Sequence, residues 1–202
     1  MGVSTESMVI DLASADIIPA IQSYLEGLSK RPESARRYLI HTSGSGILAD
    51  FSTGEGNEAP RVYSDVSDVK EITSFDETHF HRDVDKAVTD GGLAKNVKTA
   101  IVSPPTIYGI GKGPLKKRSI QIPAFISGTL ERGKSFTIGA GQNVWDLVHI
   151  DDLGSAYLLL VEQALKEGGG NATWGPEGYY FVETGEYVSF CSPFTIFQKL
   201  SH

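Results

Sequence analysis

The feature that most constrains this fold is an alternation of short apolar segments with segments of helical spacing. "MVIDLAS" (residues 8–14) is apolar and ended by polar residues, which is typical of a buried strand. Asp16 then stands where it can cap a helix, because apolar residues recur at helical spacing up to residue 28. "YLIHT" (residues 38–42) predicts a second strand that runs into Gly44 and Gly46.

The alternation continues to the end of the chain. Residues 80–88 predict a helix, and "VKTAIVSPP" predicts a third buried strand stopped by its prolines. Residues 119–131 suit a helix in which Pro123 lies near the start or causes a kink. "SFTIG", "VWDLVHI" and "GYYFVET" predict short strands, and residues 152–166 form the clearest helix. Apolar strands alternating with helices indicate an α/β fold with a parallel sheet covered on both faces.

Composition excludes several classes of protein. The 202 residues carry 18 basic and 25 acidic side chains, a net charge of −7, and the basic ones cluster only in "GPLKKRS". A nucleic-acid surface would need a clustered positive face, so we expect no nucleic-acid partner. The chain has no apolar run of about 20 residues and no secretory signal, so we expect no membrane partner. We identify no metal site. A single cysteine, Cys191, excludes an internal disulfide framework and is typical of a reducing, cytoplasmic location.

"GTLERGKS" (residues 128–135) matches the phosphate-loop pattern GxxxxGK[ST]. A working phosphate loop leaves a strand and opens a helix, whereas here helix-forming residues precede the loop and a strand-like segment follows it. Glu131 would also place a negative charge beside the phosphates. We interpret the stretch as a helix end capped by glycine, with a nucleotide triphosphatase as the less favoured alternative.

"YGIGKGP" (residues 108–114) is the second glycine-rich stretch. Its glycines alternate, and Pro114 removes an amide that a phosphate would need, so it does not match a dinucleotide fingerprint. A mobile loop near a site is the interpretation that we keep.

Four segments together resemble the extended short-chain dehydrogenase/reductase family, of the NAD-dependent epimerase/dehydratase type. They are "VIDLASAD", "YLIHTSGSGIL", "VKTAIVSPPTIYGIGKGP" and "NVWDLVHIDDLGSAYLLLVEQAL". The resemblance is strongest to the atypical NAD(P)-dependent oxidoreductases. It implies an incomplete Rossmann-like doubly wound parallel sheet with a small substrate-binding portion, NAD or NADP as cofactor, and hydride transfer at a carbonyl or alcohol carbon of a small molecule.

The resemblance also implies a division of the chain. Residues 8–108 would be a partial NAD(P)-binding domain, and residues 143–167 would be its return strand and helix. Residues 109–142 and 168–202 would form the partial substrate-binding portion. The family's glycine-rich turn has no counterpart, so we expect a chain truncated at both ends. Loss of the first strand would leave a sheet edge open to pairing, which makes a homo-oligomer an expectation.

The resemblance assigns cofactor-binding roles to five residues. Ala13 and Ser14 would lie on the loop that passes the cofactor, and Thr42 would lie near the nicotinamide. Pro104 and Ile107 would belong to the loop that closes over the nicotinamide.

For catalysis, the helix that carries the family's YxxxK pair reads "HFHRDVDKAV" here, which places His81 at the tyrosine and Asp85 at the lysine. His81 would act as acid or base, with Asp85 one helical turn away orienting it. The alternative is that both are exposed helix residues. The family's serine falls on Gly44, and Ser43 would hydrogen-bond the substrate oxygen. Tyr108 is either a second catalytic hydroxyl or a packing residue.

Arg118, Asn143 and Trp145 would contact substrate. For Arg118 and the two lysines before it, a solvated charge run is the alternative. His149 is interpreted as structural rather than catalytic.

Asp151 or Asp152 would cap the helix that follows His149.

Two functions remain open at this point. One is an oxidoreductase impaired by the missing turn, and the other is a non-catalytic binding or regulatory protein that keeps the NAD(P) fold.

Overall fold

The computed structural model describes residues 7–32, 34–50, 52, 56–134, 136–137, 139–184 and 187–189. The chain divides into two compact units. Unit 1 comprises Met1–Ala49, Tyr63–Ser103 and Ala156–Phe181, and unit 2 comprises Asp50–Val62, Pro104–Ser155 and Val182–His202.

Unit 1 is built on a parallel sheet. Its strands are β1 (Ser7–Asp11), β2 (Arg37–Thr42), β3 (Lys98–Ser103) and β6 (Tyr179–Phe181), paired in the order β1-β2-β3-β6. Every pair is parallel, so all four carboxyl ends lie at one edge of the sheet. The α/β fold with a partial, Rossmann-like parallel sheet is confirmed, and β2 and β3, the two central strands, are the most buried.

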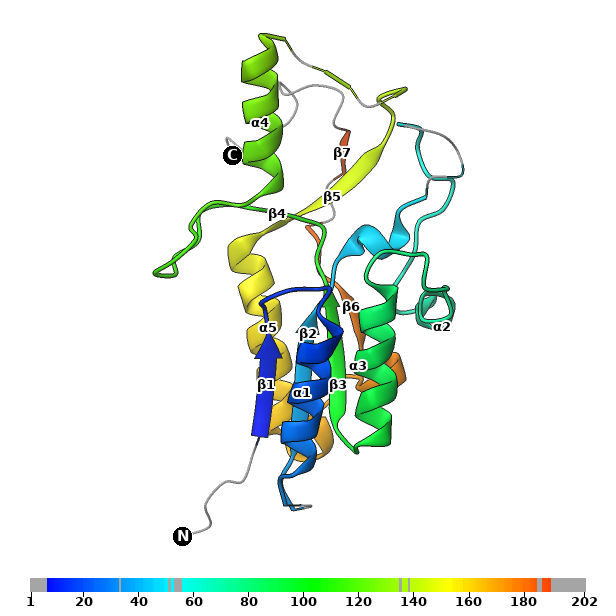
Figure 1. Cartoon of the computed structure of the whole chain (residues 1–202), viewed down its shortest axis with the longest axis vertical. Helices are drawn as coiled ribbons and strands as arrows, with labels where there is room; N and C mark the ends of the chain where they lie inside the picture. Colours follow the sequence, from blue (N-terminus) through cyan, green and yellow to red (C-terminus); the bar gives the residue numbers. More distant parts are fainter. Residues whose placement is uncertain are drawn as a thin grey trace. The chain divides into compact units, whose positions relative to one another are not determined.

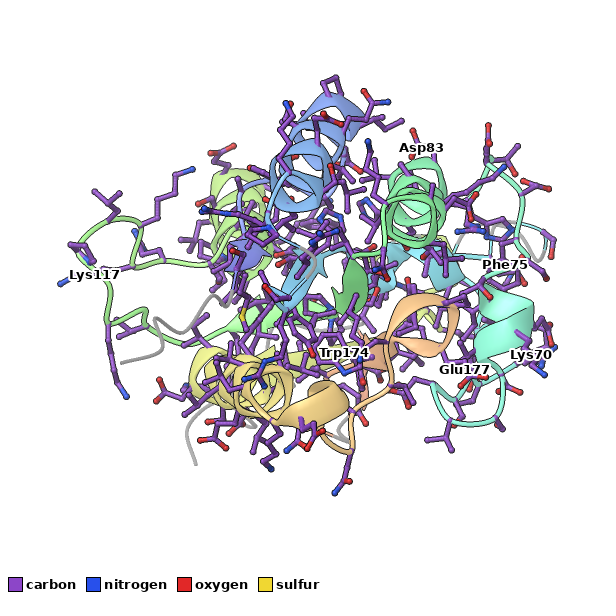
Figure 2. All side chains as sticks on the ribbon, turned by 90° about the horizontal axis from the view of Figure 1, so that it is seen from below. Lys70, Phe75, Asp83, Lys117, Trp174 and Glu177 are labelled. Carbon is purple, nitrogen blue, oxygen red and sulfur yellow. The ribbon has the colours of Figure 1, made fainter. Side chains whose placement is uncertain are left out.

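Helices cover both faces of this sheet. The helices α1 (Ile18–Ser29) and α3 (Arg82–Ala94) lie side by side on one face (Figure 1). In Figure 2 the unit 1 part of α5 and the segment with Trp174 lie on the other face, while Asp83 lies on the outer side of α3. A short helix, α2 (Val69–Ile72), and three 3₁₀ turns at Ser45–Leu48, Glu167–Gly169 and Gly175–Glu177 complete the unit.

The core of unit 1 forms because α1 and α3 present apolar side chains one helical turn apart to the sheet. The buried members of this core are Ile21, Leu25, Leu28, Leu39, Ile47, Val69, Ile72, Val84, Val88, Val97, Ile101 and Tyr179. Trp174 packs edge-on against Tyr38 at 4.7 Å between ring centroids, on the opposite face.

The starts of both helices differ from the sequence-based expectation. Asp16 does not cap α1: the cap position is Ile17, which makes no side-chain capping bond, and Pro19 lies in the first turn. The helix α3 starts at Arg82 rather than at residue 80, because His81 has a φ of 64° and cannot be helical. The helix also continues past Val88 to Ala94.

Unit 2 contains β4 (Thr106–Tyr108), β5 (Val144–His149) and β7 (Tyr187–Ser189). The strands β4 and β5 are parallel, and β5 and β7 are antiparallel. The helix α4 (Gln121–Arg132) and the start of α5 (Ile150–Leu165) complete it. The prediction of a strand at residues 135–139 is wrong for Phe136 and Thr137, which have irregular structure. Ser135 and Ile138 lie outside the described residues.

The phosphate-loop letters form a helix end, as expected. Gly128 to Arg132 lie within α4, and Gly133 closes the helix in the left-handed region with a φ of 66°. The Gly133 N–H donates to the Leu130 carbonyl at 3.1 Å. This glycine-capped helix end leaves no strand-to-helix turn for a phosphate. Pro123 lies in the first turn of α4, where a proline is tolerated.

Across the described part of the chain, no helix is both long enough and apolar enough to cross a membrane. The same part holds no group of three or more His, Cys, Asp or Glu side chains that could bind a metal ion. Cys191 lies outside the described residues.

Candidate functional site

The candidate site lies at the carboxyl edge of the parallel sheet in unit 1, where ligands bind in open α/β sheets. His81, in the loop that opens α3, is brought here beside Asp16 of the loop that leaves β1. The His81 Nδ1 lies 2.6 Å from Asp16 Oδ1. The His81 side chain is 22% exposed and that of Asp16 is 65% exposed, so solvent reaches the pair.

The backbone fixes the imidazole of His81 against β2. His81 is one of two non-glycine residues with a positive φ among the described residues. Its carbonyl accepts the N–H of Asp85 at 2.9 Å, which begins the α3 ladder. A Cβ placed at Gly44 would lie 3.0 Å from the His81 Nε2. A glycine is therefore what allows the ring to rest on the end of β2.

This pair can move a proton. The Asp16 carboxylate accepts the Nδ1 proton of His81, which fixes the tautomer and leaves Nε2 to accept a proton from a ligand. Once Nε2 is protonated, the same carboxylate stabilises the imidazolium. The prediction that Asp85 orients His81 is wrong, because Asp16 holds Nδ1 and Asp85 is fully buried. The alternative that His81 and Asp85 are both exposed helix residues is wrong as well, because Asp85 is buried and the His81 side chain is only 22% exposed.

Asp85 belongs to a buried polar cluster with Ser43, Ser103 and Tyr179. The Tyr179 hydroxyl donates to Asp85 Oδ2 at 2.9 Å and lies 3.2 Å from Ser103 Oγ. Burial raises the pKa of Asp85, and the nearby hydroxyls of Ser43 and Tyr179 oppose the shift. Burial and the charge of Asp85 raise the pKa of Tyr179. These groups are therefore poor general acids or bases toward a solvent-side ligand.

Ser43, predicted to bind the substrate oxygen, is buried within this cluster. Its hydroxyl lies near Asp85 and Tyr179 without reaching the geometry of a hydrogen bond to either. The contact of Ser43 with a substrate stays a prediction. Ser45, two residues on, is half-buried instead of buried.

A second polar group joins β1 to β2. His41 Nδ1 lies 2.9 Å from Asp11 Oδ2, and both side chains are buried. Thr42 donates its hydroxyl proton to the Asp11 carbonyl at 2.8 Å and lies 2.5 Å from the Tyr157 hydroxyl. Burial, opposed by the Thr42 bond, raises the pKa of Tyr157 to about 12. Tyr157 therefore stays protonated at neutral pH and anchors Thr42.

Two of the residues expected to contact a cofactor in unit 1 lie on the loop that follows β1. Ala13 is exposed, and Ser14 is half-buried. The Ala13 N–H donates to Asp11 Oδ1 at 3.2 Å, which shapes the loop. Leu12 is 65% exposed beside them and offers an apolar surface for a ring. The turn from β1 to α1 contains no glycine, so we assign no diphosphate to it.

The remaining predicted cofactor and catalytic residues lie in unit 2. Pro104 is buried, and Ile107 is half-buried on β4. Tyr108 packs against the cluster of Ile122 and Leu147 and meets the His149 ring edge-on at 5.1 Å. These contacts favour the packing role of Tyr108 over the catalytic one.

The predicted substrate residues of unit 2 differ in their exposure. Arg118 is exposed and pairs with Ile110 across a β-bridge. Trp145 is 48% exposed on β5. Asn143 has a buried side-chain oxygen for which the described residues offer no hydrogen-bond partner. Burial, assisted by the charge of Glu183, raises the pKa of Asp146.

His149 has a structural role, as expected. Its Nδ1 accepts the N–H of Asp151 at 3.2 Å and so caps the start of α5. The prediction that Asp151 or Asp152 caps this helix is wrong, because α5 starts at Ile150 and both carboxylates lie in its first turn. Asp151 instead pairs with Lys112 at 2.7 Å. Gly109 has a φ of 101° and passes so close to the His149 ring that a side chain would clash.

Three functional candidates escaped the sequence reasoning: Asp16 as the partner of His81, Tyr157 as the anchor of Thr42, and Tyr179 as the partner of Asp85. Asp16 carried a usable signal, since it follows a strand of the parallel sheet and so reaches the same edge as His81. Tyr157 and Tyr179 carried none, because a tyrosine in an apolar helix or strand is equally typical of a core residue.

Comparisons with known proteins bear on the family and the fold of the chain. The profile of the family described as "NAD dependent epimerase/dehydratase family" matches residues 52–172. A relative named "Oxidase ucsJ", from Acremonium sp, is 31% identical over 192 residues, which cover 90% of this chain and 55% of the relative. The chain thus spans about half the length of the curated relative that it matches.

Solved structures share the fold at low identity. The UDP-glucuronic acid 4-epimerase from Bacillus cereus, in complex with UDP-glucuronic acid and NAD, has a TM-score of 0.56 and 17% identity over 91% of this chain and 51% of its own. A nucleoside-diphosphate sugar epimerase from Corynebacterium glutamicum has a TM-score of 0.60 and 15% identity over 96% of this chain and 38% of its own. With the family profile matching more than half of its residues, the chain belongs to the NAD dependent epimerase/dehydratase family.

Proposed function

We propose that the chain is an NAD(P)-dependent oxidoreductase or epimerase-like protein that acts on a carbonyl or alcohol carbon of a small molecule, with His81 as its acid and base. The observation that carries the proposal is the bond of 2.6 Å between His81 and Asp16 at the carboxyl edge of the parallel sheet. Family membership supports the cofactor, as do the NAD named with a structural neighbour and the oxidase named as a relative.

The protein's part in the reaction is to hold the substrate oxygen and move its proton. When bound, NAD(P) supplies or accepts the hydride. In the direction of reduction, the protonated Nε2 of His81 donates a proton to the substrate oxygen. In the direction of oxidation, the neutral Nε2 accepts the proton of the substrate hydroxyl. The Asp16 carboxylate stabilises the charged imidazole in both directions.

Other assignments enter as parts of this proposal. Ala13, Ser14 and Thr42 would line the nicotinamide end of the cofactor, and the resemblance gives a cofactor-binding role to Pro104 and Ile107 as well. Arg118, Asn143 and Trp145 would contact the substrate. The predicted domain boundaries, a homo-oligomer and a cytoplasmic location are likewise proposals that rest on the sequence pattern.

The proposal is tested by comparing the turnover of the wild type with that of a variant at His81. Oxidation of NADH and NADPH is followed against a panel of carbonyl compounds for the wild type and for His81→Asn. Asparagine tolerates the left-handed backbone of His81 but cannot titrate near neutral pH. We expect the variant to lose about 10²- to 10⁴-fold in turnover, the usual contribution of a general acid or base. Cofactor binding without turnover in the wild type would instead favour a non-catalytic NAD(P)-binding protein.

A further inference from the structure

One buried carboxylate, that of Asp11, stands at the start of the loop that carries Asp16. The loop spans residues 12–17, between the end of β1 and the start of α1 (Figure 1). Asp11 is 4% exposed, whereas Leu12 is 65% exposed and Asp16 is exposed as well. The loop therefore leaves the sheet at a buried residue and runs over the surface before it reaches His81.

Both side-chain oxygens of Asp11 are used within unit 1. Its Oδ1 accepts the Ala13 N–H at 3.2 Å, and its Oδ2 lies 2.9 Å from His41 Nδ1. His41 lies directly opposite Asp11 in the parallel register of β1 and β2 and is 0% exposed. A carboxylate that accepts from two donors fixes its own rotamer and the direction of the amide two residues along the chain. The turn after β1 is thus tied to the central strand β2 through one side chain.

The same ties continue to the catalytic pair. The Asp11 carbonyl accepts the Thr42 hydroxyl at 2.8 Å, which binds the end of β1 to β2 a second time. Further along the loop, the Ser14 hydroxyl accepts the Asp16 N–H at 3.3 Å, and Asp16 Oδ1 lies 2.6 Å from His81 Nδ1. Short steps along the chain and hydrogen bonds therefore join the buried pair of β1 and β2 to the pair at the surface.

The Asp16 carboxylate needs this support because it is exposed. A charged contact at the surface contributes little to stability, so the bond from Asp16 to His81 does not by itself hold the loop in place. A buried hydrogen-bonded carboxylate is costly to displace, since its partners would be left unpaired. Asp11 is therefore the group that can hold the start of the loop in one conformation.

We propose that Asp11 is a positioning residue: by bonding Ala13 and His41 at once, it orients the loop so that Asp16 meets the imidazole of His81. Asp11 does not touch the substrate, because its side chain is buried and both its oxygens are engaged. The inference rests on the proposed function for its catalytic consequence, whereas its geometry stands independently of that function.

Three variants of the full chain test the inference. Asp11→Asn keeps an acceptor for the Ala13 N–H and a donor for His41 Nδ1, which becomes an acceptor once the ring changes tautomer. Asp11→Leu has a similar volume and offers neither bond. Val97→Ala creates a cavity in the core directly before β3, at the opposite edge of the sheet, and is the control for lost stability.

Two NMR measurements on the cofactor-free protein report the geometry. Hydrogen exchange of the Ala13 amide reports its bond to Asp11, and the ring resonances of His81 report its bond to Asp16. In the wild type and in Asp11→Asn, we expect the Ala13 amide to exchange about tenfold or more below the rate of an unprotected amide. Asp11→Leu should lose this protection and shift the His81 resonances toward those of Asp16→Ala. Val97→Ala should leave the His81 resonances at their wild-type positions.

The wild type alone can overturn the inference, so the test does not depend on the folding of Asp11→Leu. An Ala13 amide that exchanges in the wild type at the unprotected rate would show that Asp11 does not hold the loop. Unshifted His81 resonances in Asp11→Leu would also overturn the inference, as would an equal shift in Val97→Ala.

A double-mutant cycle tests the catalytic consequence. We expect Asp11→Leu to lower kcat about tenfold in the wild-type background but less than about twofold in Asp16→Ala, where no carboxylate is left to position. Equal losses in the two backgrounds would overturn the positioning role. If instead His81→Asn left turnover unchanged, the proposed function would fail, while hydrogen exchange and the ring resonances would still decide whether Asp11 orients the loop.

Discussion

The carboxyl edge of unit 1 and the predicted substrate residues of unit 2 contrast sharply. In unit 1, His81, Asp16 and Gly44 come from three separate segments and meet at hydrogen-bond or contact distance. In unit 2, Arg118 is exposed and Tyr108 packs in an apolar cluster. The difference teaches that resemblance to a family motif suggests which segments lie near a site. Only the three-dimensional structure shows which side chains in those segments contact one another. The proposed function accordingly places its acid and base in unit 1.

The largest effect, after that of His81 itself, is expected for Asp16→Asn. The variant removes the charge that stabilises a protonated His81, and we expect turnover to fall about 100-fold. Steady-state kinetics with the best carbonyl substrate measure it, with Asp90→Asn as the exposed control. If both variants kept wild-type kcat, the carboxylate of Asp16 would have no part in the reaction.

A smaller effect is expected for Gly44→Ala. The backbone of Gly44 is extended, with a φ of −161°, so alanine introduces no strain but places a methyl group 3.0 Å from the His81 Nε2. We expect the ring to move and turnover to fall about tenfold. Gly46→Ala is the matched control, because its methyl group would meet the same nitrogen at an ordinary 3.5 Å. Equal losses in the two variants would contradict the close seat of the ring on Gly44.

Asp85 should also make stability depend on pH. Because its pKa is raised on folding, its contribution to stability is complete below the unfolded value of 3.8 and is lost as pH rises through the folded value. Asparagine does not ionise, so we expect the stability of Asp85→Asn to lack this decrease as pH rises. Chemical denaturation from pH 4 to pH 8 should therefore show the wild type losing stability relative to the variant. A difference that does not change with pH would refute the raised pKa.

The smallest effect is expected for Arg118→Gln in unit 2. Its guanidinium is exposed, so the charge is screened by solvent, and we expect KM to change by less than about threefold. Substrate titrations at low and high salt measure the change. If Arg118→Gln lowered kcat/KM more than Asp16→Asn does, unit 2 rather than unit 1 would hold the more important residue.

Much of the fold followed from the sequence because apolar strands and helical spacing are local patterns. The strands β2, β3 and β5 and the helices α1, α4 and α5 were predicted to within a few residues. The short strand β4 was missed because three residues after a Pro-Pro pair carry no periodicity. The start of α3 was misplaced because only tertiary contacts hold His81 in a left-handed conformation.

The site was predictable in part. Helix spacing predicted that His81 and Asp85 lie one turn apart, but it could not show that Asp85 turns inward, since residues four apart share one face without revealing which face is buried. Asp16 lies 65 residues from His81, so only the three-dimensional sheet edge joins them. Ser43 likewise lies near Tyr179 of β6, a strand far along the chain.

The most direct test of the central claim is kcat/KM for NAD(P)H-dependent carbonyl reduction, compared between the wild type and His81→Asn. The account predicts that the variant loses most of this rate while it still binds the cofactor. A variant that keeps the wild-type rate would show that another group moves the proton.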